Sequence, residues 1–216
     1  MTGPRILRVD PYAFDYPLLR PVVDLLLNGG VAAGPTQTFY ALIAAADQPE
    51  ALTRIQTLKA RDRNKPLMLL LDRRERVLCY ARELPECVEG LIGAFWPGPL
   101  TILLRALTNL HPALVGPTNT VGVRVEGLPV IRALVRALDR AITGTSANPG
   151  GEAPACTARE VVRYFGDRVD LVLDGGPCPG NLPTTLIDAE LGPPRLLRDG
   201  ILRLDDLVRI APDLRT

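Results

Sequence analysis

The sequence predicts a single α/β domain in which helices pack on a twisted, mixed β-sheet. Apolar segments of strand length alternate along the chain with segments of helical periodicity. No composition shift, low-complexity linker or internal repeat divides the 216 residues, and a hydrophobic content of 47% is sufficient for a sizeable core. We therefore expect one domain over residues 1–216, with two small domains as the alternative.

The first third of the chain contains five expected elements. They are a strand at residues 5–9, a helix at 16–27, a strand leading into a loop at 31–36, a helix at about 48–58 and a buried strand at 67–71. Asn28-Gly29-Gly30 ends the first helix. Asp47 is the expected cap of the second helix, which has Pro49 in its first turn.

The remaining elements follow the same alternation. Strands are expected at 100–104, 120–125, 141–145, 170–173, 184–188 and 195–197, with helical stretches around 73–81, 85–95 and 128–138. Thr157 and Glu160 form a capping-box pattern before a further apolar helix. The 21 prolines lie mostly in connections, and such rigid loops on a sheet are where a functional site is expected.

Composition excludes several classes of protein. A formal net charge of +1 provides no global attraction to nucleic acid or anionic lipid, so any such role requires a local patch. The four cysteines and the single histidine lack the spacing of a zinc site, and we expect no metal site. Nowhere do about 18 apolar residues follow one another uninterrupted, so we expect a cytoplasmic protein without a membrane association.

One short segment concentrates positive charge. The only two lysines, Lys59 and Lys65, lie in a seven-residue loop that also contains Arg61 and Arg63, while arginine supplies the positive charge elsewhere. A compact ammonium beside a planar guanidinium suits a phosphate or carboxylate ligand. A solvated helix end, favoured by the helix dipole, explains the charge equally well.

Two other segments carry small hydroxylated residues where a strand ends. Residues 143–151 (Thr-Gly-Thr-Ser-Ala-Asn-Pro-Gly-Gly) and residues 34–40 (Gly-Pro-Thr-Gln-Thr-Phe-Tyr) both have this composition. Ligands of open α/β sheets bind at the carboxyl ends of strands, and small residues there let backbone amides approach a phosphate. Each segment is also compatible with an ordinary turn.

Arg124 occupies an unusual position inside the expected strand at 120–125. If Val121, Val123 and Val125 face the core, the two-residue period of a strand places Arg124 on the opposite face with Thr120 and Gly122. That face is either solvent-exposed or the floor of a cleft, and the small Gly122 favours a cleft.

Together these segments resemble the YrdC/TsaC family of threonylcarbamoyl-AMP synthases over about residues 18–200. Seven motifs occur in the family's order: Pro-Thr-x-Thr-x-Tyr at 35–40, Lys59-x-Arg61 with Lys65-Pro66, Trp-Pro-Gly-Pro-Leu-Thr at 96–101, Thr-x-x-x-Arg at 120–124, Ser146-Ala147-Asn148, Asp-Gly-Gly at 174–176 and Leu-Leu-Arg-x-Gly at 196–200. The resemblance implies a YrdC-like domain with a concave cationic cleft.

The resemblance also implies a reaction. In this family L-threonine captures bicarbonate as a carbamate, which attacks the α-phosphate of ATP to give threonylcarbamoyl-AMP and pyrophosphate for tRNA modification at adenosine 37. ATP is then a substrate, and Mg²⁺ is expected to be bound by the triphosphate. Such a transfer mainly requires positioning and cations, which agrees with the lack of a recognisable side-chain nucleophile.

The family's functional residues carry over by motif. Lys59 and Arg61 correspond to catalytic cations, and Thr38 and Arg124 to threonine-binding residues. The positions that correspond to ATP contacts are Arg61, Lys65, Thr120, Ser146, Asn148 and Arg198. Because a lysine at a helix end seldom packs in a core, Lys59→Ala is expected to abolish activity with little change in thermal stability.

This chain also departs from the family pattern. Gln37 stands where the family usually has an acidic residue, and Pro183-Thr184-Thr185 replaces the more usual Glu-Ser-Thr. A Pro-Thr-Thr sequence before a strand is similar to the YciO-like paralogues. The alternative is therefore a YciO-like or YrdC-like protein that binds nucleotide or RNA, such as tRNA or double-stranded RNA, without synthase activity. A synthase would instead supply its product to a downstream t6A transferase machinery.

Overall fold

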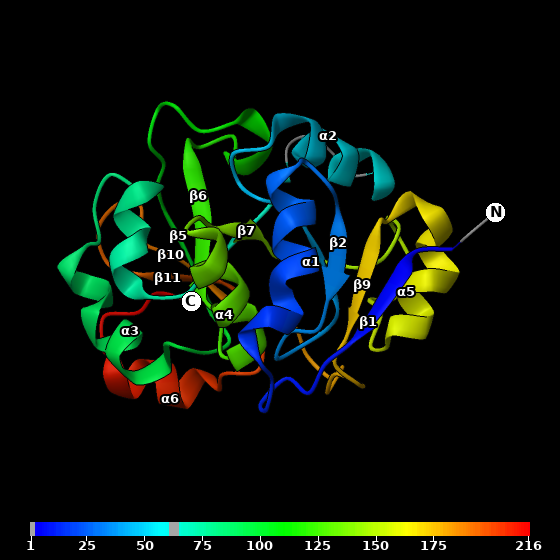
Figure 1. Ribbon diagram of the computed structural model, residues 1–216. Coiled ribbons are helices and arrows are strands. Elements are labelled where there is room, and N and C mark those ends of the chain that lie inside the picture. Colours follow the sequence, from blue (N-terminus) through cyan, green and yellow to red (C-terminus); the bar gives the residue numbers. More distant parts are fainter. Residues whose placement is uncertain (1–2, 61–64) are drawn as a thin grey trace.

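The computed structural model describes residues 3–60 and 65–216, and these form a mixed α/β fold (Figure 1). The predicted class is confirmed, but the strands form two mixed sheets of five and six strands where a single sheet was expected. The α-helices are α1 (Tyr16–Leu27), α2 (Pro49–Leu58), α3 (Glu89–Phe95), α4 (Pro129–Leu138), α5 (Ala158–Phe165) and α6 (Leu204–Ile210).

The five-stranded sheet has the order β1-β9-β2-β3-β8. Its strands are β1 (Arg5–Arg8), β9 (Leu171–Asp174), β2 (Ala32–Gly34), β3 (Ala41–Ile43) and β8 (Thr145–Ser146). β9 pairs in parallel with both β1 and β2, whereas the β2–β3 and β3–β8 pairs are antiparallel. The short loop between β2 and β3 therefore lies at the end of this sheet where β2 finishes.

The six-stranded sheet has the order β11-β10-β5-β6-β4-β7. Its strands are β11 (Arg195–Arg198), β10 (Thr185–Asp188), β5 (Leu100–Arg105), β6 (Thr120–Val125), β4 (Leu69–Leu71) and β7 (Ile142–Thr143). β6 is fully buried and lies between antiparallel β5 and parallel β4. Its register pairs Arg124 with Leu70, so these two side chains share one face of the sheet.

Gly144 connects the two sheets. The segment expected as one strand at 141–145 divides into β7 and β8, which belong to different sheets and are separated only by this glycine. The Gly144 amide donates to Met68 O at 2.8 Å, and a Cβ at this position would lie 2.5 Å from Leu70 Cγ. The backbone thus passes too close to β4 for any side chain, which is why glycine is required here.

Helices α1 and α4 pack together over the junction of the sheets and lie on the same side of the strands in Figure 1. Leu19, Val22 and Leu26 from α1 form one core cluster with the buried face of α4 and with Leu70 and Ile142. The neighbouring residues Leu69 and Leu71 belong to a second cluster, which packs beneath the other helices. Because successive side chains of β4 point to opposite faces of the sheet, this one strand contributes to the core clusters on both faces.

Several predicted boundaries and element types change. The helical stretch expected at 73–81 is a 3₁₀ helix (Arg74–Cys79), and that expected at 85–95 divides into a 3₁₀ helix (Glu86–Val88) and α3. A third 3₁₀ turn (Pro112–Leu114), a fourth (Gly166–Arg168), the strand β3 and the helix α6 were not predicted.

The two predicted helix caps have different outcomes. The capping box of α5 is confirmed, since Thr157 Oγ1 accepts the Glu160 amide and the Glu160 carboxylate accepts the Thr157 amide. Asp47 does not cap α2, because the N-cap residue is Gln48 and the Asp47 carboxylate forms an ion pair with Arg140 instead. A tertiary partner 93 residues away thus replaces the local contact.

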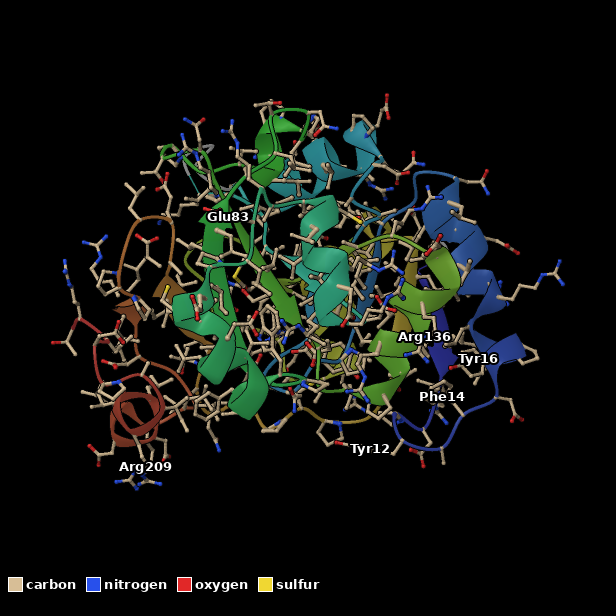
Figure 2. The ribbon with its side chains drawn as sticks, turned by 90° about the vertical axis from the view of Figure 1, so that its left-hand side faces the viewer. Tyr12, Phe14, Tyr16, Glu83, Arg136 and Arg209 are labelled. Carbon is tan, nitrogen blue, oxygen red and sulfur yellow. The ribbon has the colours of Figure 1, made fainter. Side chains whose placement is uncertain are left out.

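Tyr12, before α1, and Tyr16, the first residue of α1, are exposed, whereas Phe14 is half-buried against the core. Phe14 and Tyr16 make an edge contact with ring centroids 5.9 Å apart, and Figure 2 labels all three side chains. In the part of the chain that the structure describes, no helix is long and apolar enough to cross a membrane.

Candidate functional site

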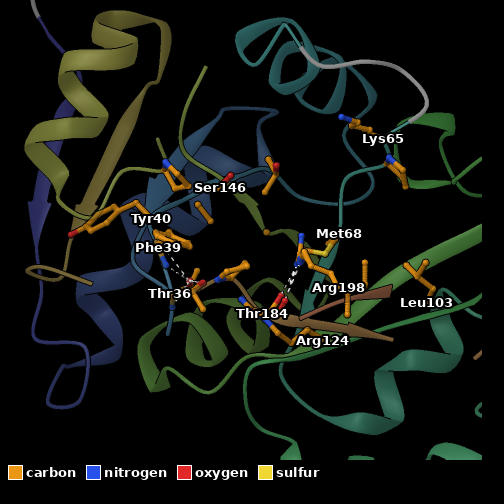
Figure 3. A pocket seen from close by; sticks show the side chains of 18 residues that line it. Thr36, Phe39, Tyr40, Lys65, Met68, Leu103, Arg124, Ser146, Thr184 and Arg198 are labelled. Atoms are coloured by element: carbon orange, nitrogen blue, oxygen red, sulfur yellow. Dashed lines mark hydrogen bonds between the residues drawn. The ribbon is translucent and has the colours of Figure 1, made fainter. Parts of the chain in front are cut away.

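A cleft of about 440 Å³ lies where the two sheets meet, which is within the usual size range of small-molecule sites (Figure 3). The loop between β2 and β3 and the strand β8 line it from the five-stranded sheet, and β5, β6, β10 and β11 line it from the other. Its lining combines apolar side chains, including Phe39, Met68, Leu103 and Leu186, with hydroxyl groups and basic residues.

Within the described part of the chain, the charged groups that line the cleft are Lys65, Arg124 and Arg198. Among the lining residues that the structure describes there is no aspartate, glutamate or histidine. Three basic side chains from a loop, from β6 and from β11 therefore converge on one cavity. This arrangement suits a ligand that carries carboxylate or phosphate groups.

Arg124 lies at the floor of the cleft and is only 2% exposed. Its Nη2 donates to Oε2 of Glu126, which is itself fully buried. The Nε atom is buried and has no hydrogen-bond partner within the described residues. The guanidinium is thus fixed at one edge by a carboxylate and retains an unused donor, and the face that it shares with Gly122 is a cleft, as the strand pattern favoured.

Arg198 faces the same cavity from β11. Its Nε and Nη2 donate to Thr184 O at 3.2 and 2.9 Å, and Nη2 also contacts Thr184 Oγ1 at 3.2 Å. Burial lowers the pKa of Arg198 from its usual value, and the positive charge of Arg124 lowers it further. The two guanidinium groups therefore lie within each other's field, and an anion between them would relieve their repulsion.

The loop between β2 and β3 presents Thr38 to the cleft. Thr36 Oγ1 donates to Phe39 O at 2.7 Å and lies 3.1 Å from Thr38 Oγ1. Because the single proton of the Thr36 hydroxyl is used in the first contact, Thr38 is the donor in the second. The lone pairs of the Thr38 hydroxyl oxygen are then left to accept a hydrogen bond from a ligand.

Lys59 is buried, in contrast to the helix-end lysine that the sequence suggested. It is 4% exposed, and its Nζ donates to Ser146 O, to Asn148 O at 2.9 Å and to Asn148 Oδ1 at 3.1 Å. Ser146 Oγ donates to the same Asn148 Oδ1 at 2.7 Å. Lys59 therefore holds the Ser146–Asn148 turn in place. The prediction that Lys59→Ala would change thermal stability little assumed a solvated side chain, and the burial of Lys59 removes that assumption.

The predicted site residues fall into three groups. Thr38, Lys65, Arg124, Ser146 and Arg198 line the cleft. Lys59 and Asn148 contact the lining residue Ser146, and Thr120 lies at the other end of β6 from Arg124 without lining the cleft. Arg61 lies outside the described residues. Both ends of the Asn148 amide are engaged by the protein, since Nδ2 donates to Pro149 O and Glu152 O. Nothing in this geometry tests the roles assigned to these residues, which stay predictions.

Three residues that support the cleft were assigned no role from the sequence, although Tyr40 and Thr184 lie in segments that the motifs name. Thr184 anchors Arg198, Tyr40 supports the loop that carries Thr38, and Glu126 holds Arg124. A signal for Glu126 was present, because it follows Arg124 by two residues at the end of a strand. Thr184 and Tyr40 owe their positions to contacts between distant segments, which no local pattern reveals.

The segment at 174–180 packs behind the cleft loop. Tyr40 Oη donates to Gly176 O at 2.8 Å and accepts the Gly175 amide at 3.2 Å, and burial, with the charge of Asp174, raises the pKa of Tyr40. The Gly180 amide donates to Thr38 O at 3.0 Å, and the Cys178 amide donates to Cys156 O at 2.8 Å. Burial, together with the nearby Cys156, raises the pKa of the Cys178 thiol to about 11.

Cys178 should consequently react slowly with thiol reagents. The raised pKa leaves the thiolate almost unpopulated at pH 8, whereas Cys79 is exposed. With iodoacetamide at pH 8 we expect Cys178 to be alkylated at least about tenfold more slowly than Cys79, with a rate that rises as the pH approaches 11. Peptide mass spectrometry over time measures both rates, and Cys79→Ser should remove the fast reaction. Equal rates would contradict the buried environment of Cys178.

Metal ligands are scarce in the described parts of the chain. Over residues 3–60 and 65–216, no group of three or more histidine, cysteine, aspartate or glutamate residues is close enough to hold a metal ion. The cleft lining described by the structure offers hydroxyl oxygens but no carboxylate, so it does not form a protein cage for Mg²⁺.

The fold and the cleft define a two-sheet α/β protein with an anion-binding geometry at the sheet junction. The family model Sua5/YciO/YrdC, described as "Telomere recombination", matches residues 24–200. The chain is 32% identical over 197 residues to a threonylcarbamoyl-AMP synthase of Pyrococcus abyssi (strain GE5 / Orsay), covering 91% of this chain and 58% of that protein. The chain therefore belongs to the Sua5/YciO/YrdC family, as its motifs suggested.

Solved structures show the same relationship. The crystal structure of P. abyssi Sua5 complexed with L-threonine has a TM-score of 0.92 and 30% identity, and the match covers 97% of this chain and 62% of that one. E. coli YciO has a TM-score of 0.84 and 24% identity, covering 93% of this chain and 98% of that one, and it shows the fold alone. This chain thus spans less than two thirds of its Sua5 relatives.

Proposed function

We propose that this protein is an L-threonylcarbamoyladenylate synthase, which forms threonylcarbamoyl-AMP and pyrophosphate from L-threonine, bicarbonate and ATP for tRNA t6A37 modification. The main support is Arg124, a buried guanidinium whose Nε has no partner among the described residues, and which shares the cleft with the acceptor oxygen of Thr38. An α-amino acid carries a carboxylate, which Arg124 could bind, and an ammonium group, which could donate to the Thr38 oxygen. A threonine complex of the related P. abyssi Sua5 lends further support.

The chemistry places few demands on the protein beyond positioning. The amine of threonine attacks bicarbonate, a C–N bond forms, and loss of water leaves a carbamate. A carbamate oxygen then attacks the α-phosphorus of ATP, and the bond to the pyrophosphate oxygen breaks. Lys65 and Arg198 line the cleft and would face the charge that develops on phosphate. Mg²⁺ would enter with the nucleotide, bound by its phosphate oxygens and water.

Lys59, Ser146 and Asn148 form one hydrogen-bonded unit at the edge of the cleft. Lys59 holds the turn through two carbonyls and the Asn148 amide, and Ser146 brings that turn to the wall of the cleft. Ser146 and Asn148 are proposed as part of the ATP site together with Thr120, and Lys59 with Arg61 as the catalytic cations. The expected location is cytoplasmic, and the product would pass to a t6A transferase machinery.

Turnover tests the proposal directly. The protein is incubated with ATP, bicarbonate and Mg²⁺, with or without L-threonine, and pyrophosphate and the adenylate are measured. We expect both products only when L-threonine and bicarbonate are present. Absence of product under conditions in which the P. abyssi relative is active would reject the synthase.

The alternative is a protein that holds nucleotide or RNA in the same cleft without chemistry. The uncharged Gln37 and the Pro183-Thr184-Thr185 sequence favour it, since both depart from the usual synthase pattern. Binding dominated by phosphate contacts weakens steeply as salt rises. Salt-sensitive binding of tRNA or double-stranded RNA by a protein without pyrophosphate release would support this alternative.

A further inference from the structure

Glu126 is a fully buried carboxylate at the end of β6, outside the set of residues that the motifs single out. Its Oε2 accepts from Arg124 Nη2, and its Oε1 accepts the backbone amides of Gln37 and Leu128, both at 3.2 Å. One side chain thus connects the strand that carries Arg124, the loop that carries Thr38 and the first residues of α4. Each carboxylate oxygen has a defined partner.

The contact with Arg124 restricts how that guanidinium can turn. Arg124 is held at Nη2, while its Nε is buried and has no partner among the described residues. A planar guanidinium recognises a carboxylate through parallel N–H donors, so the orientation of its plane decides whether a ligand can bind in this way. Glu126 also opposes the mutual repulsion of Arg124 and Arg198, whose charges act on one another across the cleft.

The contact with the Gln37 amide fixes the other half of the amino-acid site. Gln37 precedes Thr38, so anchoring its backbone to β6 sets the distance between the Thr38 hydroxyl and Arg124. The Gln37 side chain also packs directly on Gly127, where a Cβ would lie 2.0 Å from Gln37 Cδ. An acidic residue at position 37 would bring a second negative charge close to the Glu126 carboxylate. The neutral Gln37 avoids this repulsion, so the residue types at positions 37 and 126 are electrostatically compatible.

We propose that Glu126 is a positioning residue for the amino-acid substrate, which orients the Arg124 guanidinium and fixes the Thr38 loop relative to it. Glu126 does not line the cleft and acts on the substrate through Arg124 and the Gln37 amide, while its third contact, with the Leu128 amide, ties it to the start of α4. This inference rests on the proposed synthase function. It also assigns Glu126 a selective effect, because among the described residues the hydrogen bonds of this carboxylate go to Arg124 and to the amides of Gln37 and Leu128, and not to Lys65, Ser146 or Arg198, which are proposed to face ATP.

Kinetics of Glu126→Gln test this selectivity. The amide keeps the size of the side chain but places an NH₂ group opposite one of the three donors that now meet the carboxylate. We expect the KM for L-threonine to rise at least about tenfold, with kcat and the KM for ATP within about threefold of wild type. Glu126→Asp, which keeps the charge on a shorter side chain, should recover part of the threonine affinity.

The matched control is Glu83→Gln, at an exposed carboxylate that does not line the cleft and is labelled in Figure 2. It should leave all three kinetic parameters unchanged. An unchanged KM for L-threonine in Glu126→Gln, or equal increases in both KM values, would overturn the proposal. Circular dichroism and a melting curve of each variant establish that the folded protein is being compared.

A second measurement does not depend on turnover. In wild type, nitrogen NMR of the arginine side chains should show two distinct Nη signals for Arg124, assigned by their loss in Arg124→Lys, because the contact with Glu126 hinders rotation about Nε–Cζ. A single averaged signal in an active enzyme would overturn the positioning role. Two distinct signals in a protein without turnover would instead reject the synthase, and with it the substrate role, while the anchoring of Arg124 would stand.

Discussion

Replacing Arg124 by alanine is expected to lower the free energy of unfolding by about 3–5 kcal/mol, because the fully buried carboxylate of Glu126 then loses its charged partner. We also expect kcat/KM for L-threonine to fall by roughly 100-fold or more through loss of the guanidinium that would bind the substrate carboxylate. Urea unfolding followed by fluorescence or circular dichroism measures the first effect, and threonine-dependent pyrophosphate release measures the second.

Two further variants separate the stability effect from the functional one. In Arg124→Ala/Glu126→Gln the unpaired charge is removed as well, so part of the lost stability should return while activity stays absent. Arg105→Ala, at an exposed arginine at the end of the neighbouring strand β5, should change stability by no more than about 0.5 kcal/mol. If Arg124→Ala were as stable as Arg105→Ala, the buried ion pair would not have the importance that we assign to it.

The sequence predicted the elements whose signals are local. The strand at 120–125 and the helix at 16–27 have the predicted bounds, since a two-residue apolar alternation and a helical apolar repeat are both contained in the segment itself. The capping box of α5 is equally local and is confirmed. The division into two sheets was not predictable in this way, because Gly144 interrupts an apolar stretch that is indistinguishable from one continuous strand.

Part of the candidate site was also accessible from the sequence. The alternation of β6 placed Arg124 away from the core valines, and the structure shows the cleft on that face. The same alternation places Glu126 on the side of Arg124. However, no local pattern indicates that the Glu126 carboxylate accepts a hydrogen bond from the backbone amide of Gln37. The contact of Arg198 with Thr184 likewise depends on how β10 and β11 pair, which is a property of the assembled sheet.

Lys59 shows the limit of local reasoning most clearly. The residue follows the last turn of α2, where a lysine is usually solvated, but its side chain is 4% exposed. The turn that covers it lies 87 to 89 residues further along the chain. A position at a helix end predicts the local electrostatics of a side chain, whereas its burial depends on the segments that pack against it.

Lys59→Ala is therefore expected to reduce both stability and activity. Two backbone carbonyls and the Asn148 amide lose the ammonium that they share, and buried acceptors without a donor are costly, so we expect a loss of about 2–3 kcal/mol. For a chain of this length that corresponds to a melting temperature lower by roughly 4–12 °C. Activity should fall as well, because the turn that brings Ser146 to the cleft is no longer held.

The second lysine of the chain is the matched control for this experiment. Lys65 lies close to Lys59 in the sequence and lines the cleft, but it is exposed. Lys65→Ala should therefore weaken ATP use while changing the free energy of unfolding by no more than about 0.5 kcal/mol. Melting curves and ATP-dependent pyrophosphate release on both variants give the comparison. Equal melting temperatures for the two variants would show that the three contacts of Lys59 add little to stability, and its effect on activity would then be electrostatic.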